Sequence, residues 1–205
     1  MDRLTFAFMV TPGETDREAL MLAESIRAFA GDFRDGGIQV MIPEIETQLA
    51  AATRAQFESL SVRIARFPIN RDLLEFPFAA KVLAAAAAES LTAGQTGTLA
   101  WMDVDSLVTG DPAELVLGTE EQFAYRPVDH TLIGSLWDQE IDGFWQLIYA
   151  HCKVDPERLW PMIATVDERR IRPYFNGGIV VVRPEKGLLG AWRDAFDELH
   201  RREVF

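Results

Sequence analysis

Short apolar runs alternate with amphipathic segments through the first half of the chain. Residues 4–10 form a continuous apolar run, typical of a strand buried on both faces. Residues 38–42 and 62–67 are further candidate strands, and residues 98–102 form a fourth that ends at Asp103.

Helical segments lie between these strands. Thr15 and Glu18 match a capping box, which predicts a helix that Gly31 closes. This helix places apolar side chains on one face, namely Leu22, Ile26 and Phe29. Pro43 is expected to start a weaker helix, and residues 78–89 form an alanine-rich one. The regular alternation predicts an α/β fold, a mostly parallel sheet with helices on both faces.

The second half is less regular. Residues 122–128 indicate a strand whose direction stays open, and residues 179–182 indicate another. Asp138 is expected to cap a helix, and Asp155 with Pro156 to open a shorter one. Two helices show apolar faces, made by Ile141, Trp145, Ile148 and Cys152 in one, and by Leu188, Trp192, Phe196 and Leu199 in the other. Without repeats, low-complexity tracts or linkers, we expect one domain over residues 1–205.

Composition excludes some classes of function. The formal net charge of −12 argues against a protein that binds a nucleic-acid backbone, which needs a basic face. A nucleotide stays allowed, because one metal ion and local donors can meet its few charges. The single cysteine, Cys152, fits a reducing compartment. The start lacks a signal peptide and residues 79–88 are too short for a transmembrane segment, so we expect a cytoplasmic protein.

Two carboxylates follow the fourth candidate strand. Asp103 and Asp105 face the same way if the strand continues that far. Ligands of open α/β sheets bind beyond the carboxyl ends of the strands. Close carboxylates repel each other unless a cation lies between them or one is protonated, and a hard divalent ion with diphosphate oxygens on its far side would satisfy both. The alternative is a turn cap or a solvated loop end.

Polar residues near other strand ends are candidate ligand contacts. Thr11 and Pro12 follow the first strand, where hydroxyl and backbone donors would meet a base or ribose; alternatively this loop only turns the chain. Asn176 can both donate to and accept from a sugar hydroxyl, and Gly177 and Gly178 leave room for a ligand against the backbone. The alternative there is a hairpin turn.

Basic residues could neutralise a diphosphate. Lys81 stands alone among alanines, and Arg63 and Arg66 lie on the third candidate strand; each is alternatively a solvated cation. The histidines are too scattered to indicate a ligand set, at His130, His151 and His200. No dinucleotide-binding Gly-x-Gly-x-x-Gly, Walker-type or Gly-x-Ser-x-Gly motif occurs.

The ordered pair of motifs resembles a known family. Trp-Met-Asp-Val-Asp-Ser around Asp103, followed later by Phe-Asn-Gly-Gly-Ile-Val-Val-Val around Asn176, resembles the nucleotide-diphospho-sugar transferases of the GT-A fold. The chain is most similar to the glycogenin and lipopolysaccharide galactosyltransferase type, where the second motif usually reads Phe-Asn-Ala/Ser-Gly-Val. The opening strand with Thr-Pro and the helix around Lys81 fit the same pattern, so the resemblance covers most of the chain.

The resemblance implies a glycosyltransferase that moves a sugar from a nucleotide-diphosphate donor to an acceptor, with Mn²⁺ or Mg²⁺ as electrophile. It implies that Asp105 binds the metal and that Asp103 contacts metal or ribose. The implied donor contacts are Thr11, Pro12, Lys81, Asp103, Asn176, Gly177 and Gly178, with Thr11 and Pro12 at the base. The implied catalytic residues are Asp103, Asp105 and Asn176.

The sequence departs from that pattern in two places. The family usually adds a metal-binding histidine in a C-terminal His-x-x-Gly-x-x-Lys segment, which this sequence does not contain. Either water completes the metal site, or the part that clamps the diphosphate is missing, or activity has been lost. The interval from Phe123 to Phe175 is longer than in the glycogenin type and would shape an acceptor pocket or a contact in a homo-oligomer.

Two other functions stay open. A catalytically silent GT-A-like domain with a binding or assembly role would explain the missing segment and the tryptophan-rich insert. A nucleotidyltransferase of similar topology is the least favoured, because the loop after the first strand, Thr11 to Glu14, is acidic where such enzymes carry a glycine-rich basic loop.

Overall fold

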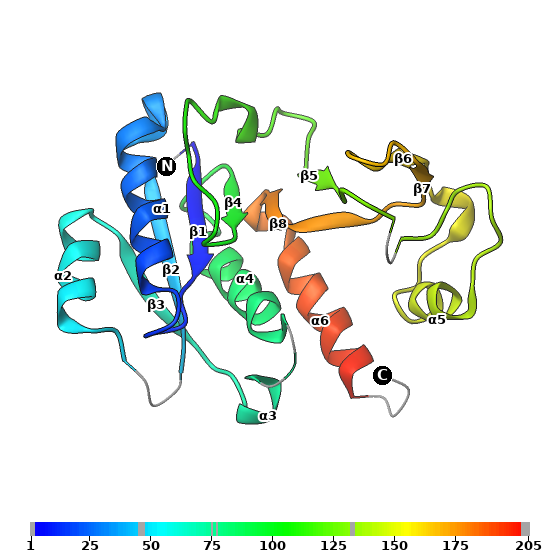
Figure 1. The fold of residues 1–205 in the computed structure, drawn as a ribbon, viewed down its shortest axis with the longest axis horizontal. Coiled ribbons are helices and arrows are strands. Elements are labelled where there is room, and N and C mark those ends of the chain that lie inside the picture. Colours follow the sequence, from blue (N-terminus) through cyan, green and yellow to red (C-terminus); the bar gives the residue numbers. More distant parts are fainter. Residues whose placement is uncertain (1–2, 45–47, 75, 77, 132–133, 202–205) are drawn as a thin grey trace. The chain divides into compact units, whose positions relative to one another are not determined.

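The computed structural model describes residues 3–44, 48–74, 76, 78–131 and 134–201. Its contacts divide the chain into two compact units. The first holds residues 1–124 and 180–193, and the second holds residues 125–179 and 194–205. The chain crosses from one unit to the other within β5 (Phe123–Pro127), β8 (Phe175–Val182) and α6 (Leu188–His200), which are labelled in Figure 1.

Parallel strands form the centre of the first unit. β1 (Thr5–Met9) pairs in parallel with β2 (Gly37–Pro43) and with β4 (Leu99–Met102), and β2 pairs in parallel with β3 (Arg63–Phe67). The six-stranded sheet has the order β3-β2-β1-β4-β8-β5. Since β1 and β4 run in parallel, their carboxyl ends meet at one edge. The mostly parallel α/β fold predicted from the sequence is confirmed.

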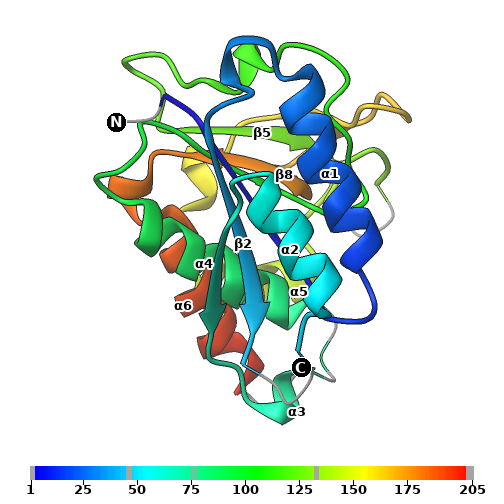
Figure 2. The same ribbon diagram turned by 90° about the vertical axis from the view of Figure 1, so that its left-hand side faces the viewer.

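Helices cover both faces of these strands. Figures 1 and 2 show α1 (Asp16–Phe29) and α2 (Ala51–Ser59) on one face and α4 (Ala79–Thr92) on the other. The alanines of α4 are buried in a core shared with Trp101 and Phe67, because small side chains let the helix backbone approach the sheet. The remaining short helices are α3 (Arg71–Leu74), η1 (Gly31–Phe33), η2 (Ala113–Leu115), η3 (Pro156–Arg158) and η4 (Pro184–Lys186). No helix within the described residues is long and apolar enough to cross a membrane.

The second unit has a small core of its own. β6 (Met162–Ile163) and β7 (Arg170–Ile171) form an antiparallel hairpin. Buried side chains of this hairpin pack against Tyr125, Leu136 and Phe175. Arg172 anchors the loop before α5 (Gly143–His151), since its guanidinium donates to the Ser135 hydroxyl at 2.9 Å and to the Gln139 carbonyl at 2.8 Å.

Two capping predictions are wrong. The hydroxyl of Thr15 accepts a hydrogen bond from the backbone N–H of Thr11 at 3.0 Å, so Thr15 makes no capping box with Glu18. The carboxylate that caps α5 belongs to Asp142, which accepts from the backbone N–H of Trp145 at 2.9 Å; the sequence pattern had pointed to Asp138. In both places several polar residues compete for the same backbone donors, and the path of the loop decides between them.

Two other segments differ from the sequence reading. Asn176, Gly177 and Gly178 lie inside β8, so the hairpin-turn alternative for them is wrong. The helix expected from Pro43 begins at Ala51, while residues 45–47 lie outside the described residues.

Glu89 is expected to contribute strongly to stability. Its side chain is 2% exposed, and it accepts hydrogen bonds from the backbone N–H groups of Leu189 at 3.1 Å and Gly190 at 2.8 Å, at the start of α6. Glu89→Ala leaves these donors without an acceptor and is expected to lower the free energy of unfolding by about 2–3 kcal/mol in urea titrations. Glu185→Ala removes one exposed hydrogen bond to Gly94 and serves as the control, with an expected loss below about 1 kcal/mol. Equal losses in the two variants would contradict this role for Glu89.

Candidate functional site

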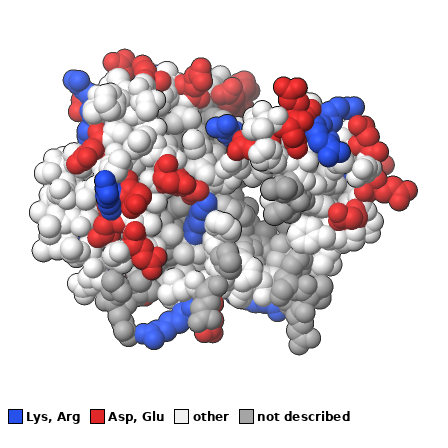
Figure 3. Space-filling model, in the orientation of Figure 1, with Lys and Arg blue, Asp and Glu red and all other residues white. Residues whose placement is uncertain are grey.

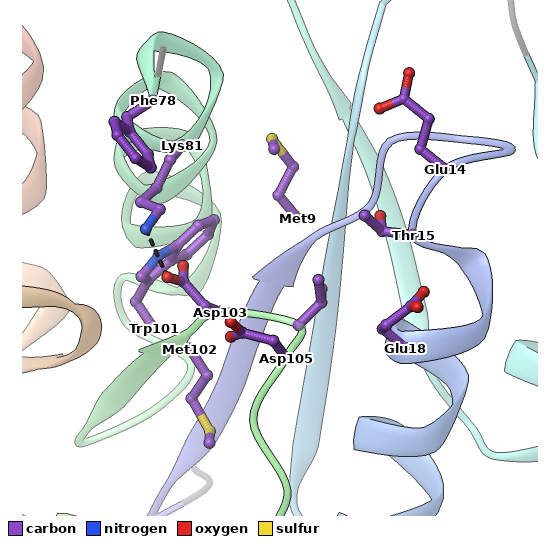
Figure 4. A pocket seen from close by; sticks show the side chains of 11 residues that line it. Met9, Glu14, Thr15, Glu18, Phe78, Lys81, Trp101, Met102, Asp103 and Asp105 are labelled. Carbon is purple, nitrogen blue, oxygen red and sulfur yellow. Dashed lines mark hydrogen bonds and ion pairs between the residues drawn. The ribbon is translucent and has the colours of Figure 1, made fainter.

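A pocket of about 370 Å³ opens where β4 ends. Asp103 directly follows β4, and the chain turns at once, with the N–H of Ser106 donating to the carbonyl of Asp103 at 3.1 Å. Four parts of the first unit line the pocket, as Figure 4 shows. The lining residues are Met9 of β1, Glu14, Thr15 and Glu18 around the start of α1, Phe78 just before α4 and Lys81 within it, and Trp101 to Asp105.

Lys81 and Asp103 form an ion pair in this pocket. The Nζ atom of Lys81 lies 2.6 Å from Oδ2 of Asp103, and the two side chains are only 17% and 29% exposed. The same ammonium lies 5.3 Å from the centroid of the Phe78 ring. The structure thus brings Lys81 and Asp103, both candidates from the sequence, into one pocket, in a direct contact that the sequence did not predict.

Asp105 occupies a different environment from Asp103. Asp105 is exposed, and its carboxylate has no hydrogen-bond or ion-pair partner among the described residues. In Figure 4 the carboxylate of Asp105 lies beside that of Asp103, and Glu14 and Glu18 lie on the opposite wall. Among the described lining residues four carboxylates thus face one ammonium. Such a pocket attracts cations and repels a bare anionic nucleotide.

Two residues of the lining have unusual features. The buried indole N–H of Trp101 has no hydrogen-bond acceptor among the described residues, and buried donors are rarely left unpaired. Phe78 has a φ of +66°, a costly conformation for a bulky side chain, and its side chain is highly exposed. Strain of this kind is concentrated at functional sites.

The donor atoms suit a hard divalent cation. Carboxylate oxygens are the ligands that Mg²⁺ and Mn²⁺ prefer, and Mg²⁺ often takes only one or two of them together with substrate phosphates. Within the described residues no three His, Cys, Asp or Glu side chains gather closely enough to form a complete protein site. The pocket can therefore supply part of a coordination shell, from Asp103 and Asp105.

The loop after β1 contributes other residues than the sequence suggested. Pro12 is buried, Thr11 donates its N–H to Thr15, and neither belongs to the pocket lining. Glu14 and Glu18, which line the pocket, were missed. The available signal was their position just after the first strand, at the edge where ligands bind. A base pocket at Thr11 and Pro12 stays a prediction.

The other candidate residues from the sequence are not part of this pocket lining. Asn176 is in β8 within the second unit, where its Oδ1 accepts the N–H of Gly178 at 2.8 Å, and its place beside the donor stays a prediction. Arg63 and Arg66 are exposed on β3 and do not line the pocket. Acidic side chains are spread over the face in Figure 3, consistent with the strongly negative net charge.

Comparison of the sequence with known protein families identifies the family of this chain. The sequence profile described as Rhodobacterales glycosyltransferase domain matches residues 6–204. No curated protein matches the chain by sequence.

Solved glycosyltransferases have a similar fold. The galactosyltransferase LgtC, in complex with donor and acceptor sugar analogues, has a TM-score of 0.51 at 14% identity over 98% of this chain and 66% of its own. The glycosyltransferase GlyE of Streptococcus pneumoniae has a TM-score of 0.51 at 11% identity, over 99% of this chain and 40% of its own. Core-mannan synthase A of Aspergillus fumigatus, in its form with Mn and GDP, has a TM-score of 0.52 at 6% identity, over 97% of this chain and 65% of its own. The chain thus spans less than two thirds of the length of these proteins. The likeness confirms the GT-A type of fold.

Removal of Asp103 is expected to lower the free energy of unfolding more than removal of Asp105. Asp103→Ala leaves the largely buried ammonium of Lys81 without its partner and is expected to lower the free energy of unfolding by about 1–2 kcal/mol. Asp105→Ala breaks no ion pair among the described residues and is expected to change the free energy of unfolding by less than about 0.5 kcal/mol. Urea titration of both variants gives the comparison, and Lys81→Met combined with Asp103→Ala should recover most of the loss. A larger loss for Asp105→Ala would contradict the role given to the ion pair.

Proposed function

The chain belongs to the Rhodobacterales glycosyltransferase domain family, and from this premise we propose that it transfers a sugar from a nucleotide-diphosphate donor to an acceptor with the help of a divalent metal ion. The observation that carries the proposal is the pair Asp103 and Asp105 at the end of β4, lining one pocket with Lys81. These side chains could hold a metal on one side and a diphosphate on the other.

Five residues of the pocket have a stated task in this proposal. Asp105 holds the metal, and Asp103 contacts the metal or the ribose. Mn²⁺ or Mg²⁺, when bound, would neutralise the charge that develops on the leaving diphosphate. Lys81 adds a second positive charge from α4. Met9 and Trp101 make the inner wall largely apolar.

Other contacts in the proposal come from outside this lining. Thr11 and Pro12 would contact the nucleotide base, and Asn176, Gly177 and Gly178 would contact the donor sugar or the acceptor. The metal and nucleotide of the Aspergillus fumigatus enzyme and the sugar analogues of LgtC support this class of ligands, as does the shared fold. The cytoplasm is the proposed compartment, because the single cysteine fits reducing conditions.

Nucleotide binding is expected to depend on metal. UDP or GDP with Mn²⁺, at about a hundred times the dissociation constant, should stabilise the native chain by about 2.7 kcal/mol. This corresponds to a rise in melting temperature of about 5 °C or more, measured in a thermal shift assay, and either ligand alone should give much less. Asp105→Asn should abolish the joint effect, whereas Asp35→Asn, whose side chain is 91% exposed, is the control that should keep it. Equal shifts in Asp105→Asn and the parent would contradict the site.

Turnover of nucleotide-sugar donors distinguishes an enzyme from a catalytically silent binding domain. Slow hydrolysis of nucleotide-sugar donors, followed as release of nucleoside diphosphate, is expected with Mn²⁺ or Mg²⁺ and should fall about a hundredfold or more in Asp105→Asn. Joint binding of metal and nucleotide without any turnover would instead favour a catalytically silent domain.

A further inference from the structure

The packing of α4 holds the ammonium of Lys81 in place. Buried alanines fix the helix against the sheet, and the side chain of Lys81 is itself largely buried on its way to Asp103. The ring of Phe78 lies on another side of the ammonium. By contrast, the exposed pair of Arg34 and Asp35, at 3.7 Å with side chains 64% and 91% exposed, is screened by water. The Lys81–Asp103 pair is therefore a fixed part of the pocket.

This ion pair affects the carboxylate that a metal would use. A cation approaching Asp103 meets the ammonium of Lys81, which already lies 2.6 Å from Oδ2. Two positive charges on one partly buried carboxylate repel each other, more strongly than they would in bulk water. Asp105 stays available, so a divalent cation would enter a pocket in which part of the carboxylate charge is already neutralised.

A diphosphate would change this balance. Its oxygens accept strong, charge-assisted hydrogen bonds from an ammonium, so they offer Lys81 a second partner. The carboxylates of Glu14, Glu18 and Asp105 repel a diphosphate that arrives without a cation. Each ligand would thus remove the obstacle to the other: the diphosphate would draw Lys81 away from Asp103, and the metal would offset the carboxylates.

We propose that Lys81 is a positioning residue that couples the two ligands, by holding Asp103 until a diphosphate takes over its ammonium. This coupling deepens the proposed function and rests on it. Thermodynamic reciprocity then requires that Mn²⁺ raise the affinity for the nucleotide by the same factor by which the nucleotide raises the affinity for Mn²⁺.

The test is metal binding in the absence of nucleotide. Mn²⁺ is titrated into the full chain and free Mn²⁺ is measured by electron paramagnetic resonance. Lys81→Met is expected to bind Mn²⁺ about tenfold more tightly than the parent, because Asp103 is released, and Lys81→Arg is expected to keep the weak binding of the parent. Titration of UDP and GDP with and without Mn²⁺ should show that the enhancement by Mn²⁺ shrinks about tenfold in Lys81→Met.

A double-variant comparison distinguishes this coupling from a general charge effect. If Lys81 acts through Asp103, then Lys81→Met changes Mn²⁺ affinity in the parent but has little effect in an Asp103→Asn background. Equal tightening in both backgrounds, or no tightening in folded Lys81→Met and Lys81→Gln, would overturn the coupling while the proposed function stands. A parent chain that binds neither Mn²⁺ nor any nucleoside diphosphate would overturn the proposed function, and the coupling with it.

Discussion

The charge balance at the end of β4 is the constraint on which the site depends. Asp103 and Asp105 lie close together, and only the ammonium of Lys81 opposes them among the described lining residues. A fold can keep such like charges together if the backbone on both sides is fixed. Here β4 is buried between neighbouring strands, and α4 is fixed by its alanines.

The first loop completes this electrostatic setting. Glu14 and Glu18 stand on the opposite wall, so the pocket is acidic on both sides and apolar at Met9 and Trp101. Such a lining repels a bare diphosphate, so the proposed donor would have to enter together with a cation. The metal proposed for the site and the coupling proposed for Lys81 both follow from that one requirement.

The second half of the chain carries the residues expected at the sugar. Asn176 to Gly178 belong to β8, which continues from the second unit into the core of the first at Val180 and Val182. The family match covers residues 6–204 and so includes both units. The tryptophan-bearing interval is therefore part of the family domain, with its own small core around Met162 and Ile171.

The sequence by itself determined the strands and the positions of the carboxylates. Periods of apolar residues fix which segments are buried, so β1 to β4 were predicted within a few residues, and Asp103 was placed correctly at a strand end. Only the tertiary structure decided the caps at Thr15 and Asp142, the entry of Glu14 and Glu18 into the pocket, and the contact between Lys81 and Asp103. These depend on how segments distant in the sequence approach one another, at a precision of about one hydrogen-bond length. Local patterns carry no such information, because the same side chain can be solvated or paired according to what the fold brings beside it.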